Sequence, residues 1–323
     1  MPRPFQLAAL VGLLASQWAL ISGAGADSHQ DIDYAEFQPL VTESMLLDIT
    51  GIDGRLVAVG ERGHVLFSDD GSSWQQAEHV PTRSTLTSVI AIGGRLWAGG
   101  HDAVIITSGD RGKTWSRQFY APERQQAVMD FHFTDENNGV AMGSYGLSLE
   151  TSDGGRTWTE NLVDPENDFH LNDVIALPDG RRMIAGEAGY SYRSSDDGRT
   201  WEALELPYIG SMWGAIASSD DCVVFYGLRG HALESCDFGA TWRELDTGTL
   251  SSLSGAARWE DLLVLVGNSG VILELEDGRI SQNTHSSGVD FSSVISLGDG
   301  RFLLVGEEGV HVYPEQAREG STP

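Results

Sequence analysis

The chain has almost no lysine: Lys113 is the only one among 323 residues, and 20 basic residues stand against 47 acidic ones. A formal net charge of −27 repels the phosphates of nucleic acids and of anionic lipids, so we expect no nucleic acid partner. The acidic surface either favours basic proteins and cations as partners or simply keeps the protein in solution.

Cysteine is almost absent as well, with only Cys222 and Cys236. Neither these cysteines nor the nine histidines follow the spacing of a zinc site, so we expect no metal and no other cofactor. The two cysteines are predicted to lie nearly opposite each other in a β-hairpin. In an oxidising compartment they form a disulfide if their side chains point to the same face, and remain free if they do not.

Long apolar runs are missing except at the N-terminus, where Phe5 to Ile21 is followed by the small residues Ala24-Gly25-Ala26. With Arg3 in front, this pattern is typical of an export signal and its cleavage site. We therefore predict a signal peptide at residues 1–26 and a periplasmic or secreted mature protein that does not insert into the membrane. A retained membrane anchor is the alternative, although the run is short for a transmembrane helix.

What the chain does contain is a repeated motif, Ser-x-Asp-x-Gly-x-Thr-Trp. Its tryptophans are 41 to 43 residues apart, which indicates a repeat architecture. The motif residues are Asp69, Asp110, Asp153, Asp196 and Asp237, with Trp74, Trp115, Trp158, Trp201 and Trp242.

A second marker, Gly-x-x-Gly, lies upstream of each tryptophan and extends the count to seven units, from Gly60 to Gly306. Each unit carries two apolar runs joined by an Asp-Gly or Gly-Gly turn, then a third run, the aspartate turn and a fourth run. Such turns favour tight hairpins. The sequence therefore predicts an all-β, seven-bladed propeller with four strands in each blade.

The two ends of the chain test this count. The seventh unit lacks its fourth strand, and a spare strand at Glu36–Val41 precedes the first unit, so we predict that this N-terminal strand closes the ring. Residues 27–315 then form one propeller domain, and residues 316–323 a disordered tail. Six blades is the alternative, because the sixth unit has no tryptophan in its turn.

The repeated residues have structural roles. The aspartate can accept hydrogen bonds from turn amides, the glycine can adopt a positive φ, and the tryptophan can pack between neighbouring blades. Identical aspartates spread around a ring do not converge on one substrate, so we assign them to the fold.

The motif resembles the Asp-box, or BNR repeat. Together with the pattern at Gly180-Arg181 and Gly186-Glu187-Ala188-Gly189, it makes the chain similar to the photosystem II assembly and stability factor-like family of propellers. The resemblance implies a non-enzymatic scaffold or assembly factor for a membrane-associated protein complex. We expect the protein itself to be a monomer. The resemblance also implies a basic patch, which the acidity of this chain does not support.

The alternative function is a carbohydrate-active propeller, either a glycoside hydrolase or a lectin-like protein, because Asp-boxes also occur in sialidases. A sialidase requires an arginine cluster and a tyrosine nucleophile paired with a glutamate. The arginines here lie mainly in the repeated turns, and no catalytic residue is assigned.

The loops that do not repeat share one face of the predicted propeller with the Gly-x-x-Gly hairpins. We expect a protein partner to bind this face, because aromatic side chains and arginine are the usual anchors of interfaces. The alternative is that these rings belong to the core of the innermost strands. The candidates are Tyr120, Arg124, Tyr145, Tyr208 and Trp213.

Overall fold

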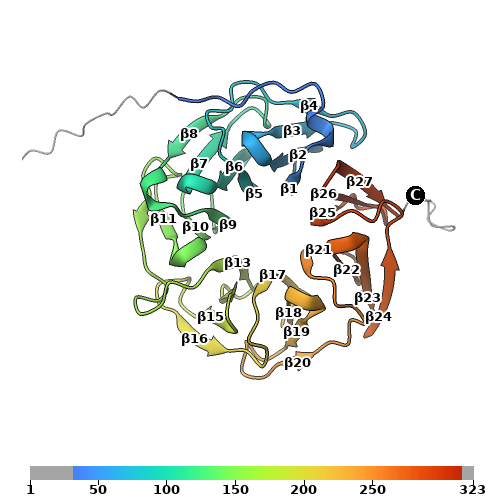
Figure 1. Ribbon diagram of the computed structural model, residues 1–323. Helices are drawn as coiled ribbons and strands as arrows, with labels where there is room; N and C mark the ends of the chain where they lie inside the picture. Colours follow the sequence, from blue (N-terminus) through green and yellow to red (C-terminus); the bar gives the residue numbers. More distant parts are fainter. Residues whose placement is uncertain (1–31, 315–323) are drawn as a thin grey trace, which may run out of the picture. The chain divides into compact units, whose positions relative to one another are not determined.

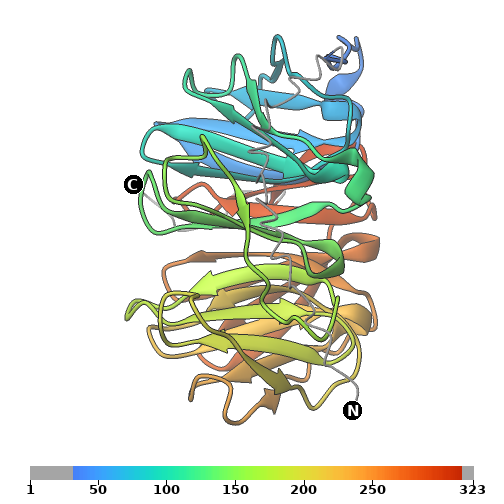
Figure 2. The same ribbon diagram turned by 90° about the vertical axis from the view of Figure 1, so that its left-hand side faces the viewer.

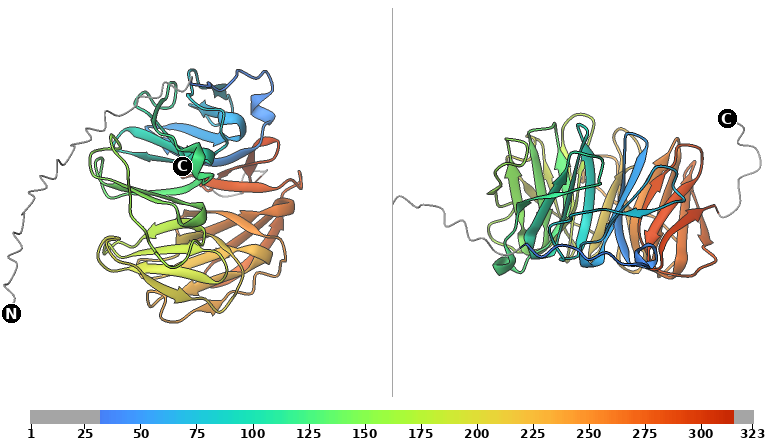
Figure 3. Two further views of the ribbon diagram at one scale, coloured as in Figure 1. Left: turned by 60° about the vertical axis from the view of Figure 1, so that its left-hand side comes forward. Right: turned by 90° about the horizontal axis from the view of Figure 1, so that it is seen from above.

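The computed structural model describes residues 32–314, and its compact unit begins at Asp33. The predicted signal peptide and C-terminal tail lie outside the described residues. Seven antiparallel sheets are arranged in a ring, so the predicted seven-bladed propeller is confirmed (Figure 1). Figure 2 and Figure 3 show the same sheets from the side and from above.

Blades 1 to 4 each have four strands in chain order from the axis outward. Blade 1 has β1 (Leu46–Ile52), β2 (Arg55–Gly60), β3 (Val65–Ser68) and β4 (Gln75–Gln76); blade 2 has β5 (Leu86–Ile92), β6 (Arg95–Gly100), β7 (Val104–Ser108) and β8 (Ser116–Phe119). Blade 3 has β9 (Val128–Phe133), β10 (Gly139–Gly143), β11 (Ser148–Thr151) and β12 (Thr159–Glu160); blade 4 has β13 (Leu171–Ala176), β14 (Arg182–Gly186), β15 (Tyr190–Ser194) and β16 (Glu202–Glu205).

Blades 5 and 6 also have four strands, and blade 7 has three. They are β17 (Met212–Ala217), β18 (Val223–Gly227), β19 (Ala232–Ser235) and β20 (Arg243–Glu244); β21 (Leu253–Trp259), β22 (Leu262–Gly267), β23 (Val271–Glu276) and β24 (Arg279–Thr284); and β25 (Phe291–Ser296), β26 (Phe302–Gly306) and β27 (Gly309–Tyr313). The short 3-10 helices are η1 (Val41–Glu43), η2 (Glu61–Gly63), η3 (His101–Ala103), η4 (Pro122–Arg124), η5 (Ser144–Gly146), η6 (Leu228–Gly230) and η7 (Asn268–Gly270).

The hydrophobic core is divided into seven clusters, one at each junction between neighbouring blades. The repeated tryptophan packs toward the blade before its own: Trp115 of blade 2 lies in the cluster shared with blade 1, and Trp242 of blade 5 packs against the cluster shared with blade 4. These tryptophans therefore lie between neighbouring blades.

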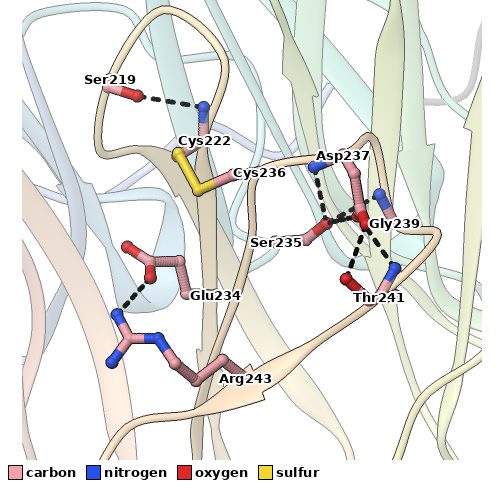
Figure 4. Close-up of a disulfide and its surroundings, with 9 residues drawn as sticks. All are labelled: Ser219, Cys222, Glu234, Ser235, Cys236, Asp237, Gly239, Thr241 and Arg243. Carbon is pink, nitrogen blue, oxygen red and sulfur yellow. Dashed lines mark hydrogen bonds and ion pairs between the residues drawn. A yellow bond between two sulfur atoms is a disulfide. The ribbon is translucent and has the colours of Figure 1, made fainter.

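The aspartate turn also forms as the motif predicts, as blade 5 shows in Figure 4. Asp237 accepts hydrogen bonds from the backbone N–H of Thr241 (2.8 Å) and from its hydroxyl (2.6 Å). The N–H of Gly239, which has a φ of 78°, donates to the hydroxyl of Ser235 (2.8 Å). These contacts hold the pKa of Asp237 below its usual value, with the Thr241 hydroxyl as the largest cause.

The first copy of the turn corrects one assignment. Asp70, not Asp69, accepts the turn hydrogen bonds, from the N–H groups of Ser72 and Ser73. This copy has one residue fewer between its aspartate and its tryptophan, so alignment on Trp74 selected the wrong carboxylate. Asp69 instead forms an ion pair with Arg55 (2.7 Å).

The predicted N-terminal closing strand is wrong. Within residues 32–314, blade 7 has only β25 to β27, and the segment predicted as the fourth strand runs along blade 1 into η1. Its backbone is engaged elsewhere: the N–H of Gln38 donates to the side-chain carbonyl of Gln76 (2.9 Å), whose amide donates to the carbonyl of Glu36 (2.8 Å).

Blades 7 and 1 are joined at the axis and through the core. The hydroxyl of Ser293 on β25 donates to the carboxylate of Asp48 on β1 (2.8 Å). Val41 of η1 is buried with Leu46 and Leu303 in the cluster between these blades. The ring is therefore closed by side-chain contacts and apolar packing between blades 7 and 1. It is not closed by an N-terminal strand added to the sheet of blade 7, as the sequence predicted.

Cys222 and Cys236 form a disulfide with 4.1 Å between their Cα atoms (Figure 4). They lie just outside β18 and β19, next to the paired residues Val223 and Ser235, and not inside these strands as predicted. Cys222 and Cys236 continue the pairing of Val223 with Ser235 by one position and so face each other across the two strands. Side chains of directly opposed residues point to the same face of a sheet, so the bond can form. It ties the turn between the first two strands of blade 5 to its aspartate turn.

Candidate functional site

The Gly-x-x-Gly hairpins form one end of the ring, together with the loops that lead from each blade to the next. In each hairpin the second residue between the glycines has a positive φ, for example 53° at Tyr145 and 56° at Arg229, so this residue is held at the tip of the turn. We call this end the loop face; the aspartate turns lie at the other end.

Two of the five candidate residues, Tyr145 and Arg124, lie at blade 3, and Tyr120 lies at the end of blade 2. Tyr145 is 57% exposed and meets the ring of His170 edge-on at 4.8 Å. Arg124 ends η4 and forms an ion pair with Glu160 (3.0 Å). Tyr120 is half-buried against the core between blades 1 and 2, with the guanidinium of Arg117 over its ring, so it contributes more to packing than to an open surface.

The other two candidates lie at blade 5. Tyr208 stacks on the ring of His231 at 3.6 Å, and Trp213 near the start of β17 is 37% exposed. The loop between blades 4 and 5 is fixed here, because the N–H of Leu228 in η6 donates to the carbonyl of Ser211 (3.1 Å).

A cleft of about 540 Å³ opens beside η6. We call it the blade 5 cleft. His231 and Glu244 are in contact in it (2.6 Å), and its lining is made of Arg229, Gly230, His231, Glu244, Leu245, Asp246, Thr247, Gly248, Thr249 and Leu250.

Two exposed apolar residues of the loop face were missed by the sequence analysis, and one of them, Leu250, lines the cleft. Ile209 and Leu250 are each 86% exposed, and they lie in the loops on either side of η6. The sequence signal that could have identified them is an apolar residue in a loop, at a position that is not apolar in the other repeat units. Exposed apolar side chains beside a half-exposed tryptophan are typical of a surface that binds another protein.

The axis of the propeller is acidic near the loop face. Asp48, Asp130 and Asp173 are each the third residue of an innermost strand, and each accepts a hydrogen bond from a backbone N–H of the next blade (2.8 Å). Burial raises the pKa of Asp48 and of Asp173 to about 6. Burial, followed by the charge of Asp173, raises the pKa of Asp130 well above its usual value.

These carboxylates join neighbouring blades, and their arrangement does not suit glycoside hydrolysis. Asp130 and Asp173 lie close enough that the charge of Asp173 raises the pKa of Asp130, whereas the two carboxylates of a glycosidase stand apart on either side of the scissile bond. Residues 32–314 contain no cluster of three or more side chains suited to holding a metal ion. None of the helices described in this part of the chain is long and apolar enough to cross a membrane.

The fold and the loop face define a seven-bladed propeller that presents aromatic and apolar side chains on one end. A family model described as the photosystem II assembly factor YCF48 matches residues 118–261. This match confirms the resemblance that the repeat motifs indicated, to the photosystem II assembly factor-like propellers.

Solved structures agree with this fold. A structure described as YCF48 bound to D1 peptide matches with a TM-score of 0.70 and 16% identity, over 84% of this chain and 91% of that chain. YCF48 from Cyanidioschyzon merolae matches with a TM-score of 0.68 and 16% identity, over 87% and 97%. The WD40 propeller of Doa1 matches with a TM-score of 0.68 at 13% identity, over 88% of this chain and 96% of its own. No curated protein sequence matches the chain.

Proposed function

We propose that the protein is an exported, non-catalytic assembly factor that binds a subunit of a membrane-associated complex through its loop face. The exposed apolar side chains of the loop face carry this proposal, because Ile209 and Leu250 are each 86% exposed and Trp213 is 37% exposed, and Leu250 lines the blade 5 cleft. The similar propeller seen with a D1 peptide supports a polypeptide ligand.

The chemistry of the cleft points to the kind of polypeptide that would fit. Glu244 and Asp246 contribute acidic groups to its lining, beside the apolar side chain of Leu250. A partner segment with basic residues could pair with these acidic groups, and its apolar residues could pack against Leu250. Export is supported by the disulfide, since such bonds persist in oxidising compartments.

Affinity capture tests the proposed function. We expect the tagged full-length protein to recover one membrane protein complex from mildly crosslinked membranes. A variant with Ile209→Ser and Leu250→Ser should lose most of this recovery, because two exposed apolar contacts are removed, while its melting temperature stays within about 2 °C of the wild type.

The matched control is Leu162→Ser, which removes an exposed leucine from the loop between blades 3 and 4 and should leave recovery unchanged. Equal recovery by the double variant and the wild type would show that the partner does not bind at blade 5. Failure of the wild type to retain any membrane protein would refute the assembly role.

A further inference from the structure

One buried position of the propeller carries a charge in a single blade. The residue paired with the serine or threonine that opens the aspartate turn is Leu56, Leu96 or Val223 in blades 1, 2 and 5, and Gly139 in blade 3. The equivalent residues of blades 6 and 7 are Leu263 and Phe302. In blade 4 it is Arg182, paired with Ser194.

The opposite wall shows a similar replacement. His132 on β9 of blade 3 is paired with Val140, and its counterparts in blades 2, 4, 5 and 7 are isoleucines: Ile90, Ile175, Ile216 and Ile295. Two polar side chains therefore replace apolar ones on facing walls of the junction between blades 3 and 4.

Arg182 is only 6% exposed, and in the described part of the chain its guanidinium forms no hydrogen bond or ion pair. The guanidinium nitrogens keep contact with solvent, and the charges of Asp197 and Glu150 act on them. Arg55, which is equally buried, shows the contrast, because it donates to both carboxylate oxygens of Asp69 (2.7 Å each). A charge with so little exposure and no hydrogen-bonded protein partner is costly, and an anion in the adjoining pocket would offset this cost.

The side chain of Arg182 lines a pocket. The pocket has a volume of about 420 Å³ and is also lined by His132 and Ser152 of blade 3 and by Arg199 of blade 4. On its other side the guanidinium lies against the aspartate turn of blade 4, because a Cβ at Gly198, which has a φ of 85°, would lie 2.8 Å from an Nη atom of Arg182.

The electrostatics of this pocket differ from those of the rest of the molecule. Burial lowers the pKa of Arg182, and Asp197 and Glu150, which also line the pocket, offset this only in part. Burial and then the charge of Arg182 lower the pKa of His132 to about 4, so its ring is neutral at neutral pH. The lining thus carries two arginines, Arg182 and Arg199, and two carboxylates, Asp197 and Glu150, so its formal charges cancel, whereas the whole chain carries a net charge of −27.

We propose that the pocket between blades 3 and 4 binds a small carboxylate, which Arg182 holds through its guanidinium. The planar fork of arginine matches the two oxygens of a carboxylate and donates to both. The volume suits a small organic acid, and a compact anion with one or two charges enters an acidic protein more easily than a polyanion. The site lies at the aspartate-turn end and is separate from the loop face.

Titration of the full-length protein tests the assignment, with acetate, succinate and inorganic phosphate as probes and chloride at equal ionic strength as reference. Acetate and succinate should raise the melting temperature of the wild type in a saturable way. Arg182→Leu, which installs the side chain found in blades 1, 2 and 6, should weaken binding at least about tenfold, since a charge-assisted hydrogen bond is lost. Arg182→Lys should retain part of the affinity, because the charge remains without the fork.

Two further observations separate a binding role from a structural one. Without ligand, Arg182→Leu should melt at a higher temperature than the wild type, because a charge with little exposure and no hydrogen-bonded protein partner is replaced by an apolar group. Arg243→Leu removes an equal charge from the surface and should keep the response to acetate. A response of Arg182→Leu equal to that of the wild type, no response of the wild type to any probe, or a response to phosphate alone would each overturn the carboxylate site.

Discussion

The free energy of unfolding is expected to fall as the pH rises from about 4 to about 6, because the carboxylates at the axis lose their protons in this range. Asp48 has its pKa raised from 3.8 to about 6, chiefly by burial. A carboxyl group whose pKa is raised by folding binds its proton more tightly in the native state, so the stability it contributes is present below pH 4 and lost above pH 6. For Asp48 alone the change is about 3 kcal/mol.

Asp48→Asn isolates this contribution. An asparagine can still accept the hydrogen bond from Val89 and can donate to the hydroxyl of Ser293, and it loses only the hydrogen bond that the carboxylate accepts from the N–H of Ile49 (2.8 Å). We expect the variant to equal the wild type near pH 4 and to exceed its stability by about 2–3 kcal/mol at pH 7. Urea unfolding at several pH values provides the measurement.

Asp261→Asn is the control, since it removes one charge from an exposed turn of blade 6. It should leave the slope between pH 4 and pH 6 unchanged. If Asp48→Asn keeps the wild-type slope, the axis carboxylate is not the titrating group. At still lower pH the aspartate turns act in the opposite sense, because hydrogen bonds hold the pKa of Asp153 and Asp196 at about 2 and this stabilisation is lost as they gain protons.

The repeat made the fold predictable, and departures from the repeat were harder to predict. The spacing of Trp115 and Trp158 and the Gly-x-x-Gly pairs gave seven blades, because each unit buries its apolar face only against its neighbours. The strand expected at Glu36–Val41 failed because pairing with β27 competes with the hydrogen bonds offered by Gln76 on blade 1. Such competition between partners distant in sequence is not encoded in a local pattern.

The candidate functional residues were likewise predicted only in part. Tyr145 and Trp213 were predicted from their positions in loops and are exposed, whereas Tyr120 is half-buried. Ile209 and Leu250 lay in the same loops, but an apolar residue in sequence gives no indication of whether it is buried. Arg182 stands next to Arg181 in a motif rich in arginine, and only the register of β14 with β15 shows that it occupies a core position.

Removal of the disulfide by Cys222→Ser with Cys236→Ser is expected to lower the free energy of unfolding by about 3 kcal/mol. The bond closes a loop with a sequence separation of 14 residues, and a loop of this size stabilises the native state by about that amount through the entropy of the unfolded chain. Urea unfolding of the variant and of the wild type under oxidising conditions measures the difference.

The wild type treated with a reductant should match the double serine variant, and the variant itself should not respond to the reductant. Because the disulfide joins the turn between the first two strands of blade 5 to its aspartate turn, hydrogen exchange should rise first in the amides around Thr241 and Val223. Exchange that rises equally in all blades would show that the bond stabilises the whole ring and not blade 5 in particular. Capture through the loop face should persist in either case, since the bond lies at the opposite end of the blade.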